Sequence, residues 1–291
     1  FLRAIGNSVI PLGFLAVSAV LNIALDLWFV IGLNRGVAGA AEATVIAQYL
    51  SGIGIAIYAL VRFPQVRSIG KLRFLRRERI REIISFSTLT CVQQSVMNLG
   101  ILMVQGLVNS FGSAVMAAFA AAVKIDAFAY MPVQDFGNAF STFIAQNYGA
   151  KESARIRSGL KGAIYISLAF CALISTLVCA FAKPLMTIFV DAGEVEVITE
   201  GVRYLRIEGI FYCGIGCLFL LYGLYRALGK PGMSVILTVI SLGTRVALAY
   251  LLSSIPSIGV TGIWWSVPIG WGLADLAGLL YYKVRKKELL A

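Results

Sequence analysis

The chain has 291 residues, of which 59% are apolar and only 13% charged, and its formal net charge is +11. Soluble domains average about 45–50% apolar and 25% charged residues, so this composition excludes an ordinary soluble protein. Histidine is absent, which removes the most common general base and metal ligand of enzymes. The composition therefore predicts an integral membrane protein with no histidine-based catalytic or metal site.

Eight apolar segments are long enough to cross a hydrocarbon core of about 30 Å as α-helices. A backbone that faces lipid must satisfy its own hydrogen bonds, and these segments are too long and too continuously apolar for the strands of a barrel. We therefore predict an all-α integral membrane fold. The predicted spans cover residues 9–31, 38–61, 83–108, 114–148, 159–182, 197–225, 233–254 and 259–282.

The sequence contains an internal repeat. A shift of 223 positions places residues 2–59 on residues 225–282 without a gap, and the identical pairs include Arg3 with Arg226, Gly6 with Gly229, Gly36 with Gly259, and Gly39 with Gly262. A repeat of this kind indicates that the chain is built twice from one unit. The copies differ at polar positions, because Asn22, Asp26 and Thr44 correspond to Arg245, Ala249 and Val267.

Basic residues are concentrated in alternate connections between the predicted spans, most densely in residues 62–82. Short cytoplasmic loops carry the excess of Lys and Arg, so the pattern predicts a multi-pass protein of the cell (inner) membrane with both ends of this segment in the cytoplasm. The positive charge is explained by this topology. It favours anionic lipid head groups as partners over nucleic acid.

The basic segment is also the longest connection and separates the two copies of the repeat. It predicts three regions: residues 1–61 as a two-helix remnant of an amino-terminal lobe, 62–82 as a basic cytoplasmic linker, and 83–291 as a carboxyl-terminal lobe of six helices. By symmetry the first copy should also belong to a six-helix lobe. We therefore expect four further spans before Phe1 and about twelve in the complete protein.

Three polar residues of the first copy are predicted to converge inside the membrane. Ionisable groups at membrane depth cost roughly 2.5–3.5 kcal/mol or more, and they usually face a cavity or a partner. Asn22 and Asp26 are one turn apart on one helix face, and Thr44 enters the next span at a similar depth. Their oxygen atoms suit a hard cation or a bound proton. The alternative is that Asp26 only caps or anchors a helix near the interface.

Other polar residues in the predicted spans are possible cavity or substrate contacts. Lys124 and Asp126 are two positions apart and therefore point to different helix faces. Charges in a bundle interior tend to pair across helices, so structural pairing is the alternative to substrate contact for each residue. The candidates are Gln93, Gln94, Lys124, Asp126, Asp135, Glu208 and Arg245.

Several motifs together resemble one family. Residues 3–7 (RAIGN) with Pro11, residues 22–26 (NIALD), and residues 36–41 (GVAGAA) with Thr44 resemble helices five and six of multidrug and toxic compound extrusion (MATE) transporters. Residues 145–150 (AQNYGA) resemble the end of that family's eighth helix, and residues 225–231 (YRALGKP) the loop before its eleventh. The resemblance covers the whole chain. It implies helices five to twelve of a twelve-helix, two-lobed antiporter.

The resemblance implies an exporter of organic cations, drugs or other xenobiotics, which works by alternating access in exchange for protons or sodium. The family's coupling site in the amino-terminal lobe matches Asn22, Asp26 and Thr44 here, and its fourth residue, an Asp of the first helix, would lie before Phe1. The implied substrate is a small, lipophilic cation. No cofactor is expected beyond the coupling ion, H⁺ or Na⁺, no metal beyond a possible sodium at Asp26, and the expected state is a monomer.

Three other functions are alternatives to this one. A flippase for lipid-linked saccharides or peptidoglycan precursors shares the two-lobed plan, and Arg203, Arg206 and Arg245 would suit its anionic substrates. An intramembrane enzyme would need a catalytic pair at one depth, such as two close carboxylates or a Ser with a base, and the sequence suggests none. A scaffold or receptor would leave Asn22, Asp26 and Thr44 unexplained.

Overall fold

The computed structural model describes residues 2–3, 5–63 and 77–289, which form helices and turns without a strand. The chain divides into two compact units, Phe1–Arg81 and Glu82–Ala291. Within the described residues, seven helices are long and apolar enough to cross a membrane, and a bent pair of helices accounts for an eighth span. The all-helical membrane fold predicted from composition is confirmed.

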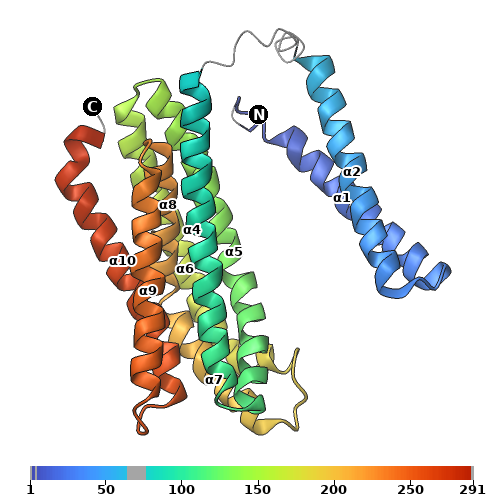
Figure 1. Cartoon of the computed structure of the whole chain (residues 1–291), viewed down its shortest axis with the longest axis vertical. Coiled ribbons are helices and arrows are strands. Elements are labelled where there is room, and N and C mark those ends of the chain that lie inside the picture. The colour runs from blue at the N-terminus through green and yellow to red at the C-terminus, as the bar shows by residue number, and fades with distance from the viewer. Residues whose placement is uncertain (1, 4, 64–76, 290–291) are drawn as a thin grey trace. The chain divides into compact units, whose positions relative to one another are not determined.

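Unit 1 is a helical hairpin. It consists of α1 (Val9–Asp26), a π-helical segment η1 (Leu27–Gly32) and α2 (Gly36–Arg62). Figure 1 shows α1 and α2 side by side, and they pack along their lengths. Small residues permit this approach: Ala43 and Ala47 are fully buried, and the Ser18 hydroxyl donates a hydrogen bond to the Ala47 carbonyl at 3.1 Å.

Unit 2 is a helical bundle centred on two helices. Helix α5 packs against α6, α7 and α8, while α8 also contacts α6, α9 and α10. Gly137 of α5 and Gly223 of α8 bring these two backbones together, because a Cβ atom at Gly223 would lie only 2.6 Å from the Gly137 carbonyl oxygen. The elements are α4 (Arg77–Asn109), α5 (Ser113–Gly149), α6 (Ser153–Met186), α7 (Val195–Ile210), α8 (Tyr212–Ala227), α9 (Pro231–Ser253) and α10 (Val260–Leu289).

The predicted span 197–225 is wrong as a single helix. The chain breaks at Phe211, and α7 and α8 are bent by 53° relative to each other. Gly209 and Gly214 flank this point, and glycine costs about 1 kcal/mol relative to alanine within a helix. At Gly209 an added Cβ would lie 3.0 Å from Cys179 Sγ, so α6 also approaches the break closely. Broken helices of this kind often line the binding sites of transporters.

The predicted linker differs from the structure at its end. Residues 77–82 are already helical and form the first turns of α4, because this charged stretch consists of good helix formers and includes the i,i+3 pair Glu78 and Arg81. A helix that continues beyond the hydrocarbon region needs no apolar residues there. The remainder of the predicted linker, residues 64–76, lies outside the described residues.

The repeat seen in the sequence is present in the backbone. Gly6 and Gly229 both adopt left-handed φ angles, +84° and +72°, and each closes a turn by donating to the carbonyl three residues earlier, at 3.1 and 3.3 Å. Gly36 is the first residue of α2, and Gly259 directly precedes α10. Their φ angles are +55° and +53°. Such angles are readily adopted only by glycine. Glycine thus occurs at the same positions of both repeat copies because the turns there require left-handed backbone conformations.

Candidate functional site

Asn22 and Thr44 meet within the α1–α2 hairpin. The side-chain amide of Asn22 donates a hydrogen bond to Thr44 Oγ1 at 3.3 Å, and the Thr44 hydroxyl donates to the Ala40 carbonyl at 3.0 Å. The contact joins two helices whose neighbouring residues are almost entirely apolar. The structure thus brings together two of the three residues that the sequence placed at one depth.

Asp26 lies one turn beyond Asn22, at the last residue of α1. Its Oδ1 atom is shielded from solvent and has no hydrogen-bond partner among the described residues. It makes no side-chain capping bond to the π-helical segment that follows, so the alternative of a simple helix cap has no support here. Buried acceptors are normally satisfied, and π-helical turns are frequent at functional sites. Asp26 therefore offers an available carboxylate oxygen inside an apolar hairpin.

A second polar cluster lies inside the bundle of unit 2. Asp126 of α5 and Glu208 of α7 are each only 3% exposed, and their carboxyl groups lie close enough to influence each other electrostatically. The hydroxyl of Tyr212, the first residue of α8, donates a hydrogen bond to Asp126 Oδ1. Tyr204 lies beside both acids, and Arg245 of α9 interacts electrostatically with both. We call these five residues the carboxyl cluster.

The carboxyl cluster has more acidic groups than basic ones. With all groups ionised, two carboxylates face a single guanidinium, and Glu208 Oε1 and Arg245 Nε have no hydrogen-bond partner in the part of the chain that the structure describes. Like charges in contact repel strongly in a medium of low polarity. One proton or one small cation would remove this imbalance. The cluster also sits at the break between α7 and α8, where a change in charge can act on the relative position of two helices.

The carboxyl cluster contains two residues that the sequence interpretation did not select. Tyr204 and Tyr212 lie four positions before and after Glu208, so all three share one helical face in an unbroken helix. This spacing is the feature of the sequence that indicates the two tyrosines as neighbours of Glu208. Arg245 joins the cluster from α9, and its counterpart in the repeat is Asn22, so both copies place a polar side chain at this position.

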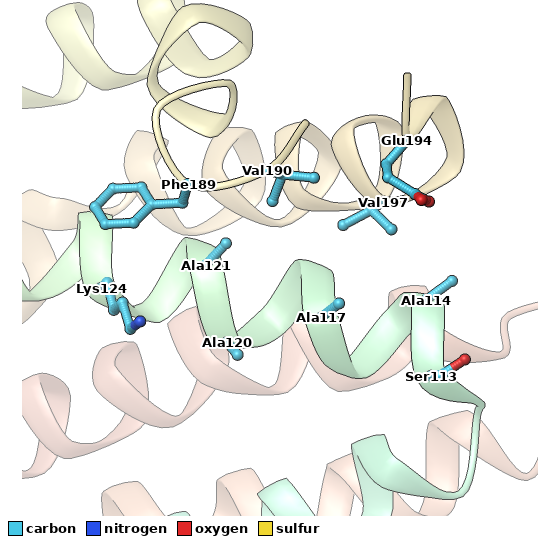
Figure 2. Close-up of a pocket in the computed structure, with 10 residues that line it drawn as sticks. All are labelled: Ser113, Ala114, Ala117, Ala120, Ala121, Lys124, Phe189, Val190, Glu194 and Val197. Carbon is cyan, nitrogen blue, oxygen red and sulfur yellow. The ribbon is translucent and has the colours of Figure 1, made fainter. Parts of the chain in front are cut away.

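Lys124 lies on a different face of α5 from Asp126. It is exposed and lines a pocket of about 490 Å³, in which its ammonium group lies 5.9 Å from the centre of the Phe189 ring. Figure 2 shows this pocket between the alanine-rich start of α5 and the segment that leads into α7, with Glu194 at the far end from Lys124. The two charges are therefore separated along the pocket.

The remaining candidates are dispersed. Asp135 is exposed and lies further along α5, more than two turns beyond the buried Asp126. On α4, Gln93 is buried while Gln94 is exposed, so adjacent residues point in different directions. The structure brings none of these three into the carboxyl cluster.

Comparison with known proteins gives one consistent result. The chain is 28% identical over 284 residues to the probable multidrug resistance protein YpnP of Bacillus subtilis and 24% identical over 299 residues to the probable multidrug resistance protein YoeA of the same organism. These matches include 97% and 99% of this chain but only 62% and 64% of the relatives. The chain thus spans a little over three fifths of their length.

The fold matches that of solved transporters. A crystal structure of the Vibrio cholerae MATE transporter VcmN superposes with a TM-score of 0.86 at 28% identity, covering 99% of this chain and 65% of that one. The MatE family model matches residues 90–251, which is more than half of the chain and includes all five residues of the carboxyl cluster. On this evidence the protein belongs to the MatE family.

Proposed function

We propose that the chain is part of an ion-coupled antiporter, driven by protons or sodium, that exports organic cations, drugs or other xenobiotics by alternating access. The observation that carries the proposal is a carboxylate oxygen of Asp26 that has no hydrogen-bond partner among the described residues and lies inside an apolar hairpin, one turn from the bonded pair of Asn22 and Thr44. Membership of the MatE family and the names of the related multidrug resistance proteins support it.

In this mechanism Asp26 binds the coupling ion. A proton neutralises the carboxylate directly, whereas sodium would be held by carboxylate, amide and hydroxyl oxygens, the ligand types that hard cations prefer. Neutralising a charge in apolar surroundings removes a large solvation cost. The ion therefore stabilises the conformation in which Asp26 is most enclosed, and it shifts the conformational equilibrium only through its different affinities for the two states.

The carboxyl cluster supplies a second position for positive charge. Asp126 and Glu208 share a proton or hold a small cation, and Arg245 keeps the occupied cluster electrically balanced. Because Tyr212 starts α8 and Glu208 lies in the last turn of α7, occupancy of the cluster alters contacts on both sides of the break. Substrate and ion then compete through the conformation that each favours.

Dye efflux from vesicles tests the proposal in the complete protein. Vesicles are loaded with a fluorescent lipophilic cation, and proton and sodium gradients are imposed separately. We expect efflux with one gradient, and Asp26→Asn should reduce it to the background of protein-free vesicles. The matched control is Glu42→Gln, which removes an exposed acid of the same hairpin that pairs with Arg35. Unchanged efflux by Asp26→Asn would show that Asp26 does not bind the coupling ion.

The orientation of the chain is tested in intact cells that produce the complete protein. We propose a cell-membrane location with both ends of this segment in the cytoplasm, because basic residues are sparse in the other set of connections. In a variant without native cysteines, Asp191→Cys should be labelled in intact cells by a membrane-impermeant thiol reagent, and Lys151→Cys only after the membrane is permeabilised. Labelling of Lys151→Cys from outside would reverse the topology.

A further inference from the structure

Three cations converge on a groove at one edge of the membrane-spanning region of unit 2. Lys183 near the end of α6 and Arg203 and Arg206 of α7 line a groove of about 560 Å³, whose walls also include Ile198, Val202 and Ile207. We call it the basic groove. It lies apart from the carboxyl cluster, because Arg203 and Arg206 are exposed whereas Tyr204, Leu205 and Glu208 of the same helix are buried.

The helices hold these cations in a defined register. Cys179 Sγ lies 3.9 Å from the Arg206 carbonyl oxygen, which sets α6 and α7 side by side at that level. Lys183 is one turn beyond Cys179 towards the end of α6, and Arg203 is about one turn before Arg206 in the antiparallel α7. Lys183 and Arg203 therefore reach similar depths on neighbouring helices.

Most of the positive charge in the basic groove is uncompensated. Arg203 pairs with Glu200 at 3.0 Å, and Glu200 is also held by the Trp264 indole, which donates a hydrogen bond at 2.8 Å. Lys183 and Arg206 form no ion pair with any residue that the structure describes. Glu194 lines the separate pocket of Figure 2. The groove thus presents two free cations and one partly neutralised cation.

The sequence places the basic groove at the edge of the hydrocarbon layer. On α6, residues 163–182 contain no charged residue and are bounded by Lys161 and Lys183. Twenty helical residues span about 30 Å, the thickness of the hydrocarbon core. On α7 and α8, the apolar part of the span likewise begins directly after Arg206, with the buried Glu208 as its only early charge. Lys183 and Arg203 therefore lie at the edge of the hydrocarbon layer, and Arg206 lies one turn further in, from where its long side chain reaches that edge.

The apolar surface next to the basic groove suits acyl chains. Ile207 and Ile210 follow Arg203 and Arg206 on the same helical face, and Ile210 is 62% exposed. The order along α7 is thus cationic at the membrane edge and aliphatic towards the membrane centre. This is the polarity of a phospholipid, with its phosphate outermost and its chains directed inwards.

We propose that the basic groove binds one phospholipid with an anionic head group, whose phosphate contacts Lys183 and Arg206. Arginine and lysine inside or at the edge of a membrane pair with an anion or reach towards the interface, and here the anion is supplied by the lipid. Basic residues are scarce in the loops at this end of the helices, so the three that gather in one groove form a local site rather than part of the general positive charge of the loops.

Lipid retention measured by native mass spectrometry tests this site. The complete protein is released from nanodiscs of phosphatidylcholine containing a minor fraction of phosphatidylglycerol. We expect one phosphatidylglycerol to remain bound in preference to phosphatidylcholine. The variant Lys183→Gln/Arg206→Gln should weaken its retention by about fivefold for each charge removed.

The matched control is Lys161→Gln/Lys283→Gln. It removes the same number of charges from exposed positions, one of them at the opposite edge of the same uncharged run of α6. This control should retain phosphatidylglycerol within about twofold of the unmodified protein, as should Lys183→Arg/Arg206→Lys, which keeps the charges and verifies that the groove tolerates substitution.

Three results would overturn the proposal. One is equal retention by the groove variant and the unmodified protein, and another is equal weakening by the groove variant and its control, which would indicate only general attraction between charges. The third is complete displacement of phosphatidylglycerol by millimolar inorganic phosphate, which would assign the groove to a free anion. The readout is independent of dye efflux, so the site can fail while the transport proposal stands.

Discussion

The hairpins α1–α2 and α9–α10 are two copies of one backbone plan with different polar contents. In the first, Asp26 places a carboxylate in the membrane without a cationic partner among the described residues. In the second, the corresponding residue is the fully buried Ala249, and the polar residue Arg245 meets acids supplied by other helices. One hairpin carries its own acid, whereas the other carries the countercharge for acids of its neighbours.

The scaffold beneath these differences is nearly the same. Gly39 lies against Phe29 and Gly262 against Leu252, which are equivalent positions in the repeat. A Cβ atom would lie 3.1 Å from Phe29 Cβ in the first copy and 2.5 Å from Leu252 Cβ in the second. The hairpin is therefore held by small residues at fixed positions, and the polar residues can diverge without altering the helix crossing.

The largest expected effect distinguishes Arg245 from its counterpart Asn22. Arg245→Gln leaves Asp126 and Glu208 buried without a cation, which should cost about 3–5 kcal/mol of stability. Asn22→Ala removes one hydrogen bond at a half-buried position and should cost about 0.5–1.5 kcal/mol. Thermal unfolding of the complete protein in detergent measures both.

A compensating variant sharpens this test. Glu208→Gln added to Arg245→Gln removes one of the two acids and should recover much of the loss, because a single carboxyl group can be protonated without repulsion from another. If Arg245→Gln unfolds at the same temperature as Asn22→Ala, the guanidinium does not balance the carboxyl cluster.

An intermediate effect is expected at Gly39 and Gly262, equivalent glycines at which the backbone of each hairpin closely approaches its own neighbouring residues. Gly262→Ala forces a methyl group against the backbone and side chain of Leu252, and overpacking of this kind costs about 1–3 kcal/mol. Gly39→Ala meets its neighbours at 3.0–3.1 Å and should cost less than Gly262→Ala. Unfolding temperatures in the same detergent rank the two, and a larger loss for Gly39→Ala would show that the first hairpin is the tighter one.

The smallest effect tests the equivalence of the copies. Gly36 and Gly259 share a left-handed φ angle, and nothing lies within 4 Å of a Cβ atom at either. Replacement by alanine should therefore cost the backbone strain alone, about 1–2 kcal/mol, and the same amount at both positions. Asparagine should be tolerated better than alanine at each. Clearly unequal losses for the two alanine variants would contradict the shared turn.

Much of the helical fold was predictable from sequence because hydropathy reports it directly. An uncharged run such as residues 163–182 must be a spanning helix, and the ungapped repeat predicts the paired turns at Gly36 and Gly259. The break at Phe211 was missed because no charged residue or proline marks it, since Ile210, Phe211 and Tyr212 are all apolar. Hydropathy measures where a segment lies and not whether it is straight, so the glycines around Phe211 were the only local indication.

The two sites differ in how far sequence could predict them. Asn22 and Asp26 are one turn apart on a single helix, and Thr44 is on the next, so local spacing was sufficient to predict the Asn22–Thr44 contact. The carboxyl cluster depends on contacts between residues far apart in the chain, such as Asp126 with Tyr212, which are separated by 86 positions. Spacing within one helix cannot predict such contacts, although it did identify Asp126, Glu208 and Arg245 as charges in need of partners.

The break at Phe211 also determines how far the end of α8 would move if the helix tilted. Helix α8 has 16 residues and is therefore about 24 Å long. The break lies beside Glu208 and Tyr212. A tilt of α8 by about ten degrees at the break would displace its far end by roughly 4 Å, which is most of the rise of one helical turn. At that end Arg226 donates a hydrogen bond to Asn138 of α5 at 3.2 Å. A tilt of α8 at this break would therefore separate Arg226 from Asn138 at the opposite end of the helix.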